Sequence, residues 1–296
     1  MHIISSAAEM TAFSRAEQRA GHRVGFVPTM GALHEGHLSL VRAARAQCDV
    51  VVVSIFVNPT QFGPNEDLAK YPRSFEQDKA MLESGGVSAI FYPSVEEMYP
   101  AGATTWVAVE GLSERLDGRS RPGHFRGVST VVSKLFNIVQ PQFAFFGQKD
   151  AAQVAVIRRM VRDLNFDVQI VVCPIVREQD GLAMSSRNAY LNMAQREAAG
   201  VIYRALRKTS EAYDKGERLP ANLRSIARSV LETEPLAEID YIAINDPRTL
   251  FGIHDWTDDP LLLSMVVKIG KPRLLDNCLL PWSFNDRAGL TSLLGV

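Results

Sequence analysis

The chain has 296 residues, enough to form the core of one large domain or two moderate ones. Of these residues 46% are hydrophobic and 22% are charged, a composition that is ordinary for a globular protein. Its formal net charge of -1 gives no general attraction to nucleic acid or to membrane surfaces. The three cysteines, Cys48, Cys173 and Cys278, are far apart and predict neither a disulfide framework nor a zinc site, which favours a reducing cytosol. The sequence shows neither an export signal nor an apolar run of membrane-spanning length, so we expect a cytoplasmic protein.

The first predicted elements are a polar helix over residues 11–20 and a strand over 24–27, followed by a turn with two glycines and a proline. A helical pattern then begins at His37. His34 and His37 flank Gly36 at this helix start, where free backbone N–H groups and the positive end of the helix dipole suit a phosphate. The alternative is that His34 makes a cap-like hydrogen bond and His37 packs on the strand.

Residues 50–57 form a continuous β-branched and apolar run without alternation, which is typical of a strand buried on both faces of a sheet. Together with the preceding strand and helix, this run predicts a right-handed βαβ unit in a parallel sheet covered by helices. It leads into a loop over 58–64 that is rich in turn residues. A helix over 75–84, a strand over 89–92 and an extra strand over 106–109 are predicted next.

Residues 115–126 carry four arginines and one histidine among glycine, proline and serine. We expect a solvated loop here, and the functional alternative is a mobile flap that covers anionic ligands. Apolar positions three and four residues apart then predict an amphipathic helix over 128–139, which ends before Pro141. A strand over 143–146, a helix over 151–163 and a strand over 168–172 follow.

The sequence changes character near residue 174, beyond which ordinary amphipathic helices and short strands follow. We predict helices over 194–212 and 223–231 and strands over 239–244 and 261–269. The segment after Asn277 shows no clear element, and partial disorder is expected there. The predicted fold is therefore α/β, with a parallel-sheet domain over 1–175 and a smaller C-terminal α+β domain over 176–296.

Three polar loops follow predicted strands, over residues 28–37, 58–61 and 147–150. Because ligands of open parallel sheets bind at the carboxyl ends of the strands, we expect these loops to converge on one crevice. Asp150 either caps the helix that follows or faces this crevice. Gln153, on the first turn of that helix, either faces the crevice too or is an exposed polar residue.

A glycine-containing loop over residues 180–188 holds two hydroxyls and a cation in succession, Ser185, Ser186 and Arg187. Such groups bind phosphate oxygens. Serine–serine–arginine occurs in many loops, so the signal is weak by itself. Paired with the two histidines upstream it becomes strong.

These motifs are together similar to the pantoate–β-alanine ligase family of the nucleotidylyl-transferase superfamily, which also includes class I aminoacyl-tRNA synthetases. The His-x-Gly-His run resembles the superfamily's first signature. Residues 184–187 stand where the Lys-Met-Ser-Lys-Ser loop would be, and Arg187 supplies a planar, permanently charged donor. The resemblance runs in order through VPTMGALHEGH, VVVSIFVNPTQFG, YPR at 71–73, RPGHFRGVSTVVSKLFNIVQP, FFGQKD, GLAMSSRNAYL and RLLDN at 273–277.

The resemblance implies a Rossmann-like domain, a C-terminal domain that closes over the active site, and ATP-dependent condensation of pantoate with β-alanine through a pantoyl adenylate. It implies that His34, His37, Lys149 and Arg187 are catalytic. Gln61 and Gln153 would hold pantoate and β-alanine. The implied ATP-binding residues are Met30, Gly31, His34, Gly36, His37, Gly147, Gln148, Lys149, Asp150, Val176, Met184, Ser185, Ser186 and Arg187.

The expected partners are the small-molecule substrates and a second copy of the chain in a homodimer, with neither nucleic acid nor membrane. Mg²⁺ is expected with the ATP phosphates, although the sequence shows no dedicated carboxylate cage and Asp78 is only a weak candidate ligand. Two alternatives stay open. A nucleotidylyl transferase of another coenzyme pathway would share the two-histidine loop without needing the paired glutamines or the NPTQFG loop, and a non-catalytic binding protein of the same fold would turn over nothing.

Overall fold

The computed structural model describes residues 1–64, 66 and 68–294, which form two compact units. The first unit comprises Met1–Phe146 and Ala152–Cys173, and the second comprises Gly147–Ala151 and the described residues from Pro174 to Leu294. The short segment Gly147–Ala151 therefore belongs to the second unit, although Gly147 is the last residue of a strand of the first. The functions expected for the two domains, binding of ATP and pantoate by 1–175 and closure over the active site by 176–296, stay predictions.

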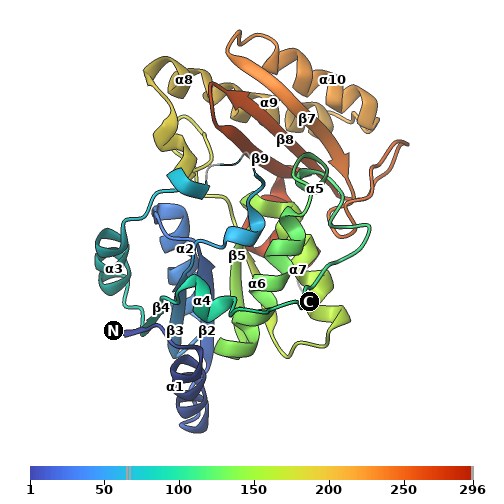
Figure 1. Ribbon diagram of the computed structural model, residues 1–296. Coiled ribbons are helices and arrows are strands. Elements are labelled where there is room, and N and C mark those ends of the chain that lie inside the picture. Colours follow the sequence, from blue (N-terminus) through green and yellow to red (C-terminus); the bar gives the residue numbers. More distant parts are fainter. Residues whose placement is uncertain (65, 67, 295–296) are drawn as a thin grey trace. The chain divides into compact units, whose positions relative to one another are not determined.

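The first unit is built on a six-stranded sheet in the order β1-β4-β3-β2-β5-β6 (Figure 1). The pairs β1–β4, β4–β3, β3–β2 and β2–β5 are parallel, which confirms the predicted Rossmann-like α/β fold. The chain moves outward from β2 to β3 and β4, and then returns to the other side with β5, so the segments after β2 and β5 leave the sheet at its topological switch point. The strands are β1 (His2–Ile4), β2 (Val24–Thr29), β3 (Val50–Ile55), β4 (Ala89–Phe91), β5 (Phe143–Gly147) and β6 (Gln169–Cys173).

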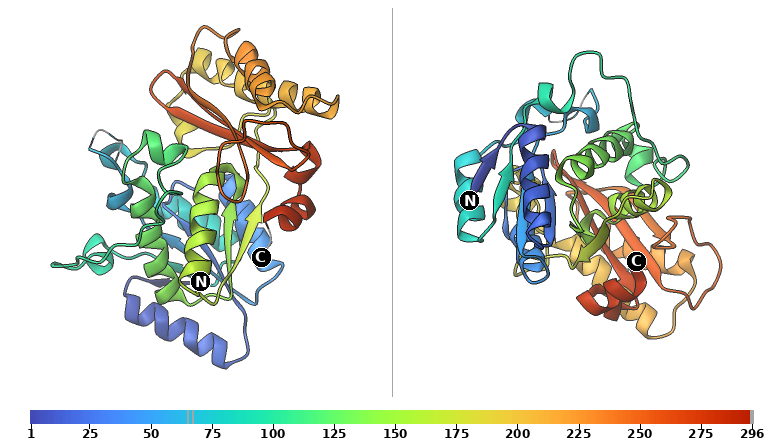
Figure 2. Two further views of the ribbon diagram at one scale, coloured as in Figure 1. Left: turned by 90° about the vertical axis from the view of Figure 1, so that its right-hand side faces the viewer. Right: turned by 90° about the horizontal axis from the view of Figure 1, so that it is seen from below.

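Helices cover both faces of this sheet (Figure 2). On one face, α2 presents Leu40, Val41 and Ala44 to the strands, as its apolar stripe predicts. On the other face, the ring of Phe26 in β2 meets Phe136 of α6 edge-on, at 6.4 Å between centroids. The helices of this unit are α1 (Ala7–Arg19), α2 (Glu35–Arg45), α3 (Phe75–Ser84), α4 (Val95–Met98), α5 (Asp117–Ser120), α6 (His124–Val139) and α7 (Ala151–Asp163), with short 3-10 helices at Pro59–Gln61 and Leu68–Lys70.

The second unit is built on an antiparallel three-stranded sheet, β7 (Ala237–Asn245), β8 (Leu261–Ile269) and β9 (Arg273–Leu280). Two helices, α9 (Gly200–Asp214) and α10 (Pro220–Leu231), pack on one face of it through an apolar core (Figure 2). The remaining elements are α8 (Met193–Ala198), α11 (Arg287–Leu294) and 3-10 helices at Gln148–Asp150, Ser186–Tyr190 and Trp282–Asn285.

Several predicted elements differ from the structure. Residues 106–109 are not a strand, because no neighbouring strand among the described residues pairs with them, and Trp106 lies exposed under the guanidinium of Arg126. The single helix predicted over 194–212 is two helices, with a break at Ala199. The segment after Asn277 showed no clear element and was expected to be partly disordered. Its described part instead completes β9 with three buried residues and then forms α11.

The solvated loop expected over 115–126 is wrong for much of the segment, which contains α5 and the start of α6. Asp117 and Phe125 are buried, and the Arg121 side chain is only 16% exposed because it lies against a carboxylate of the same unit. Whether the segment moves as a flap stays a prediction. Among the residues that the structure describes, no helix has the length and apolar character needed to cross a membrane.

Candidate active site

The two histidines form a reciprocal cap at the start of α2. His34 is the N-cap residue in an extended conformation, and its Nδ1 accepts a 3.1 Å hydrogen bond from the backbone N–H of Gly36. Its own backbone N–H donates to Nδ1 of His37 at 3.2 Å. The two rings lie 4.2 Å apart between centroids. Because each Nδ1 accepts a hydrogen bond, each neutral ring carries its hydrogen on Nε2, which is then a donor.

The loop that carries His34 is hydrogen-bonded to the side chain of Asp78, which lies in the first turn of α3. This carboxylate is 1% exposed, and it accepts hydrogen bonds from the backbone N–H groups of Ala32 at 2.9 Å and Leu33 at 2.8 Å. Gly31 directly precedes them with φ +83°, where a Cβ would come within 3.0 Å of the same carboxylate. The contacts of Asp78 therefore favour a role in shaping this loop, and binding of Mg²⁺ by Asp78 stays a prediction.

The loop after β3 is organised by a buried amide pair. Asn58, 1% exposed, donates through Nδ2 to Oε1 of Gln61 at 3.0 Å and accepts through Oδ1 from the hydroxyl of Tyr99 at 2.9 Å. The Nε2 group of Gln61 lies 3.1 Å from Sδ of Met30, which follows β2. This contact brings together two residues predicted for the site, one from each of two neighbouring loops.

Helix α6 packs closely against this loop at Gly127, whose backbone oxygen accepts a hydrogen bond from Asn58. A Cβ at Gly127 would lie 2.4 Å from the carbonyl oxygen of Thr60, so only glycine allows so close an approach. Arg121, which precedes α6, and His124, its first residue, both contact the backbone oxygen of Gln61, at 3.3 and 2.9 Å. These contacts fix the backbone of Gln61, and the hydrogen bond from Asn58 fixes its side chain.

Arg121 is itself fixed by Glu66, with two N–H···O contacts of 2.6 Å in a bidentate pair. Burial by itself raises the pKa of the Glu66 carboxyl, but the hydrogen bonds and the charge of Arg121 outweigh it and hold the pKa below its ordinary value. Sequence reasoning missed this pair. It placed Asn58 in the polar loop 58–61 expected at the crevice, but it did not predict the buried contacts of Asn58 with Gln61 and Tyr99.

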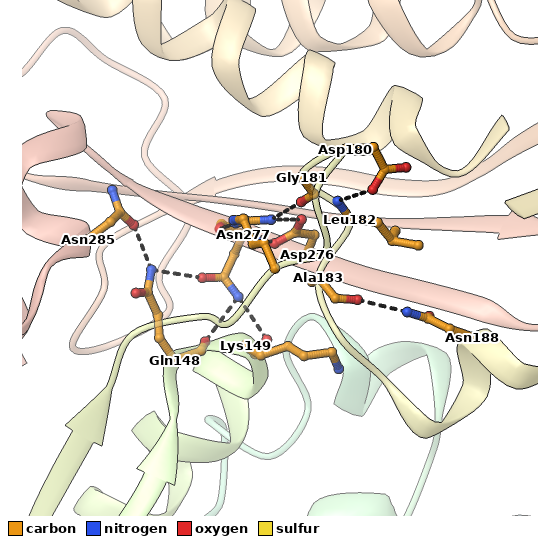
Figure 3. Close-up of polar contacts among 11 residues, drawn as sticks. Gln148, Lys149, Asp180, Gly181, Leu182, Ala183, Asn188, Asp276, Asn277 and Asn285 are labelled. Atoms are coloured by element: carbon orange, nitrogen blue, oxygen red, sulfur yellow. Dashed lines mark hydrogen bonds and ion pairs between the residues drawn. The ribbon is translucent and has the colours of Figure 1, made fainter. Parts of the chain in front are cut away.

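In the second unit, the segment Gln148–Asp150 is tied to strand β9 by Asn277 (Figure 3). The Asn277 amide donates to the backbone oxygens of Gln148 at 3.1 Å and Lys149 at 2.8 Å. The Lys149 ammonium lies 3.8 Å from a carboxylate oxygen of Asp150, and the Lys149 side chain is 23% exposed. Gly147 precedes this turn as its N-cap residue.

The loop after Pro174 is a short hairpin. The N–H of Met184 donates to the oxygen of Val176 at 3.0 Å, and residues 177 and 183 form a bridge. Ser185 then caps the 3-10 helix Ser186–Tyr190, because its hydroxyl accepts from the N–H of Arg187 at 3.3 Å. The half-buried Ser185, Ser186 and Arg187 are therefore placed together by this cap.

The predicted residues of the site thus fall into groups within each unit. In the first unit, His34, Gly36 and His37 form one group, and Met30 with Gln61 forms another. Gln153 lies half-buried in the first turn of α7, as predicted. In the second unit, the groups are residues 147–150 and residues 176 with 184–187.

A metal centre is not evident in this donor set. Among residues 1–64, 66 and 68–294, no three histidine, cysteine, aspartate or glutamate side chains gather closely enough to hold an ion. Both oxygens of the carboxylate of Asp78 already accept hydrogen bonds from the backbone. The residues present therefore do not form a cage for a resident metal.

Comparisons with known proteins agree along almost the whole chain. Residues 2–279 match the family model described as pantoate-beta-alanine ligase. The pantothenate synthetase of Koribacter versatilis (strain Ellin345) is 57% identical over 292 residues, which cover 99% of this chain and 100% of that protein. The pantothenate synthetase of Acidobacterium capsulatum is 62% identical over 257 residues, which cover 87% of this chain and 86% of that protein.

Solved structures give the same result. The crystal structure of the pantothenate synthetase from Thermus thermophilus has a TM-score of 0.89 and 48% identity to this chain, and the match covers 94% of this chain and 98% of that one. The pantoate-beta-alanine ligase of Francisella tularensis, complexed with beta-gamma ATP and beta-alanine, has a TM-score of 0.76 and 36% identity, over 94% of this chain and 97% of that one.

Proposed function

Since the chain belongs to the pantoate–β-alanine ligase family, we propose that it is a ligase that forms a C–N bond between pantoate and β-alanine. The reaction consumes ATP and gives pantothenate, AMP and pyrophosphate. A carboxylate is a poor electrophile, so the pantoate carboxylate first attacks the α-phosphorus of ATP and expels pyrophosphate. The amine of β-alanine then attacks the acyl carbon of the resulting pantoyl adenylate, and AMP leaves. The protein supplies no covalent nucleophile.

The reciprocal cap of His34 and His37 is the observation that carries this proposal. The cap fixes both rings through Nδ1 and so leaves Nε2–H as the donor of each neutral ring. Negative charge builds up on the phosphate oxygens as pyrophosphate leaves. Donors that are already oriented stabilise this charge without further reorganisation. We assign both histidines to the phosphates of ATP, together with the backbone of Met30, Gly31 and Gly36.

The second unit supplies the cationic and hydroxyl donors of the proposal. Lys149 and Arg187 carry the positive charge, and the hydroxyls of Ser185 and Ser186 donate to phosphate oxygens. Gly147, Gln148, Asp150, Val176 and Met184 would contact the remainder of ATP. We propose that the region 176–296 contributes this ATP-binding loop and closes the active site during turnover.

Pantoate would be held by Gln61 and Gln153, whose amides can pair with its hydroxyls and its carboxylate. The buried hydrogen bond from Asn58 fixes the Gln61 amide, so that its orientation does not have to be set by the substrate. β-Alanine would enter beside the same two glutamines. Mg²⁺ would accompany the ATP phosphates, and the described residues form no cage for it. A cytoplasmic homodimer stays part of the proposal.

A turnover assay tests this function. The purified chain, given ATP, pantoate and β-alanine, should release AMP and pantothenate in equal amounts. Omission of pantoate should abolish both products. A nucleotidylyl transferase of another coenzyme pathway would instead release pyrophosphate without AMP, and a binding protein would release neither. Light scattering after gel filtration reports whether the active species is a dimer.

A further inference from the structure

Strand β9 buries two consecutive polar residues between apolar ones. Asp276 and Asn277 are each 1% exposed, and Cys278, Leu279 and Leu280 after them are 0% exposed. Burial of polar side chains is costly unless each of them is fully paired. Successive side chains of a strand point to opposite faces of the sheet, so the two residues serve different neighbours.

Asn277 uses its whole amide on the segment that carries Lys149. Its Nδ2 group donates to two successive carbonyl oxygens, those of Gln148 and Lys149, and its Oδ1 accepts from Nε2 of Gln148 at 3.3 Å (Figure 3). The Gln148 amide is held a second time by Asn285, at 2.7 Å. The backbone on both sides of the Lys149 Cα is thereby fixed, which sets the direction in which the Lys149 side chain leaves the chain.

Asp276 fixes Asn277 and the neighbouring hairpin. Its carboxylate accepts from the backbone N–H of Asn277 at 2.8 Å and from Arg177 in a bidentate pair at 2.6 and 3.0 Å. Arg177 also donates to the carbonyl oxygen of Gly181 at 3.0 Å and lies over the Tyr203 ring. Gly181 is required here because its φ is +91° and a Cβ would lie 1.9 Å from that ring. Strand β9 thus fixes both the segment Gln148–Asp150, which carries Lys149, and the start of the loop 180–188, which carries Ser185, Ser186 and Arg187.

We propose that Asn277 is a positioning residue for Lys149, and that Asp276 with Arg177 anchors it. Asn277 contacts the backbone of the lysine segment and acts on the reaction only through the placement of the ammonium group. This inference rests on the proposed function in assigning Lys149 to the ATP phosphates. A displacement of about 1 Å in a group that contacts the reacting atoms can lower the rate by about 10²-fold.

A double-mutant cycle tests the proposal. In Asn277→Ala, kcat for AMP formation should fall by about 10²-fold, while KM for pantoate stays within about threefold. In a Lys149→Ala background, the same substitution should lower kcat by less than about threefold, because the group that Asn277 positions is already gone. Equal losses from Asn277→Ala in both backgrounds would overturn the proposal. Should Asn277→Ala fail to fold, Asn277→Ser, which keeps one donor of shorter reach, carries the same cycle.

Ser264 provides a matched control on the neighbouring strand. It pairs with Asn277 in the register of β8 and β9, it is 3% exposed, and its hydroxyl has no hydrogen-bond partner among the described residues. Ser264→Ala therefore changes the same sheet without releasing Lys149, and its kcat should stay within about twofold of the wild type. A loss as large as that of Asn277→Ala would assign the effect to the sheet and overturn the proposal.

A readout without turnover separates this inference from the proposed function. Acetic anhydride labels lysine amines, and mass spectrometry gives the labelling rate of Lys149 in the protein without ATP. The rate should rise at least about threefold in Asn277→Ala and stay unchanged in Ser264→Ala, because only the first releases a side chain that is 23% exposed. An unchanged rate in Asn277→Ala overturns the inference even if the wild type is fully active. A wild type that forms no AMP overturns the proposed function, and the labelling rates still decide the inference.

Discussion

The carboxylate of Asp78 accepts a 2.8 Å hydrogen bond from the backbone N–H of Leu33, which lies 45 residues earlier in the chain. With the parallel contact to Ala32, it fixes the loop that ends in the two histidines. The first turn of α3 therefore fixes the backbone of the loop that carries the proposed phosphate-binding histidines.

Loss of the Asp78 carboxylate should destabilise the protein. Asp78→Ala leaves the backbone N–H groups of Ala32 and Leu33 without their acceptor and should lower the free energy of unfolding by about 2–4 kcal/mol, measured by urea denaturation. Glu76→Ala is the matched control, since Glu76 is exposed in the same helical turn and its loss should cost less than about 0.5 kcal/mol. An Asp78→Asn variant that folds normally but binds Mg·ATP much more weakly than ATP alone would instead support a metal ligand.

The cap and the chemistry of the two histidines can be separated by substitution. His37→Gln keeps the usual partner of a capping box at this position, so the melting temperature should stay within a few degrees of the wild type. Adenylate formation should nevertheless fall by about 10²–10³-fold, the usual loss for one transition-state donor. His34→Asn, which retains a good N-cap, should behave in the same way. Near-normal activity in both variants would leave the histidines with a capping role only.

Gln153 should affect the use of pantoate more than that of ATP. A site built to pair with substrate hydroxyls loses affinity when one of its amides is removed. Gln153→Ala should therefore raise KM for pantoate at least about tenfold and change the ATP affinity, measured by calorimetry, by less than about twofold. Equal losses for the two ligands would count against this assignment.

The ion pair of Glu66 and Arg121 should make stability depend on pH in the acid range. The folded state holds the pKa of Glu66 below its unfolded value of ~4.3. The pair therefore contributes its full stabilisation above that pH and loses it as the pH falls through the lower, folded-state pKa. Urea midpoints of wild type and Glu66→Gln should differ near neutral pH and converge as the pH falls through the lowered folded-state pKa of Glu66. A constant difference across this range would mean that the carboxylate charge contributes nothing.

The sequence predicts the parts of this protein that depend on local pattern. The unbroken apolar run of β3 indicates a strand buried on both faces, and all six of its residues are buried. The apolar stripe of α2 likewise indicates the residues that face the sheet. Of the histidine cap, the sequence predicts the hydrogen bond of His34 as one alternative. It does not predict the return bond to Nδ1 of His37, which was expected to pack on the strand.

The features that the sequence does not predict depend on partners far along the chain. Arg121 looks solvated until Glu66, 55 residues away, is brought beside it. Strand β9 is obscured because Asp276 and Asn277 interrupt its apolar pattern, and their burial makes sense only once Arg177 and Lys149 are in place. Residues 106–109 have the composition of a strand, but composition does not supply a neighbour to pair with.

Isotope exchange between labelled pyrophosphate and ATP tests the two-step reaction most directly. If pantoyl adenylate forms before β-alanine takes part, exchange requires pantoate and proceeds without β-alanine. His37→Gln should slow this exchange by the same factor as the overall reaction, because both pass through the same transition state. Exchange that appears only after β-alanine is added would contradict the adenylate mechanism for this protein.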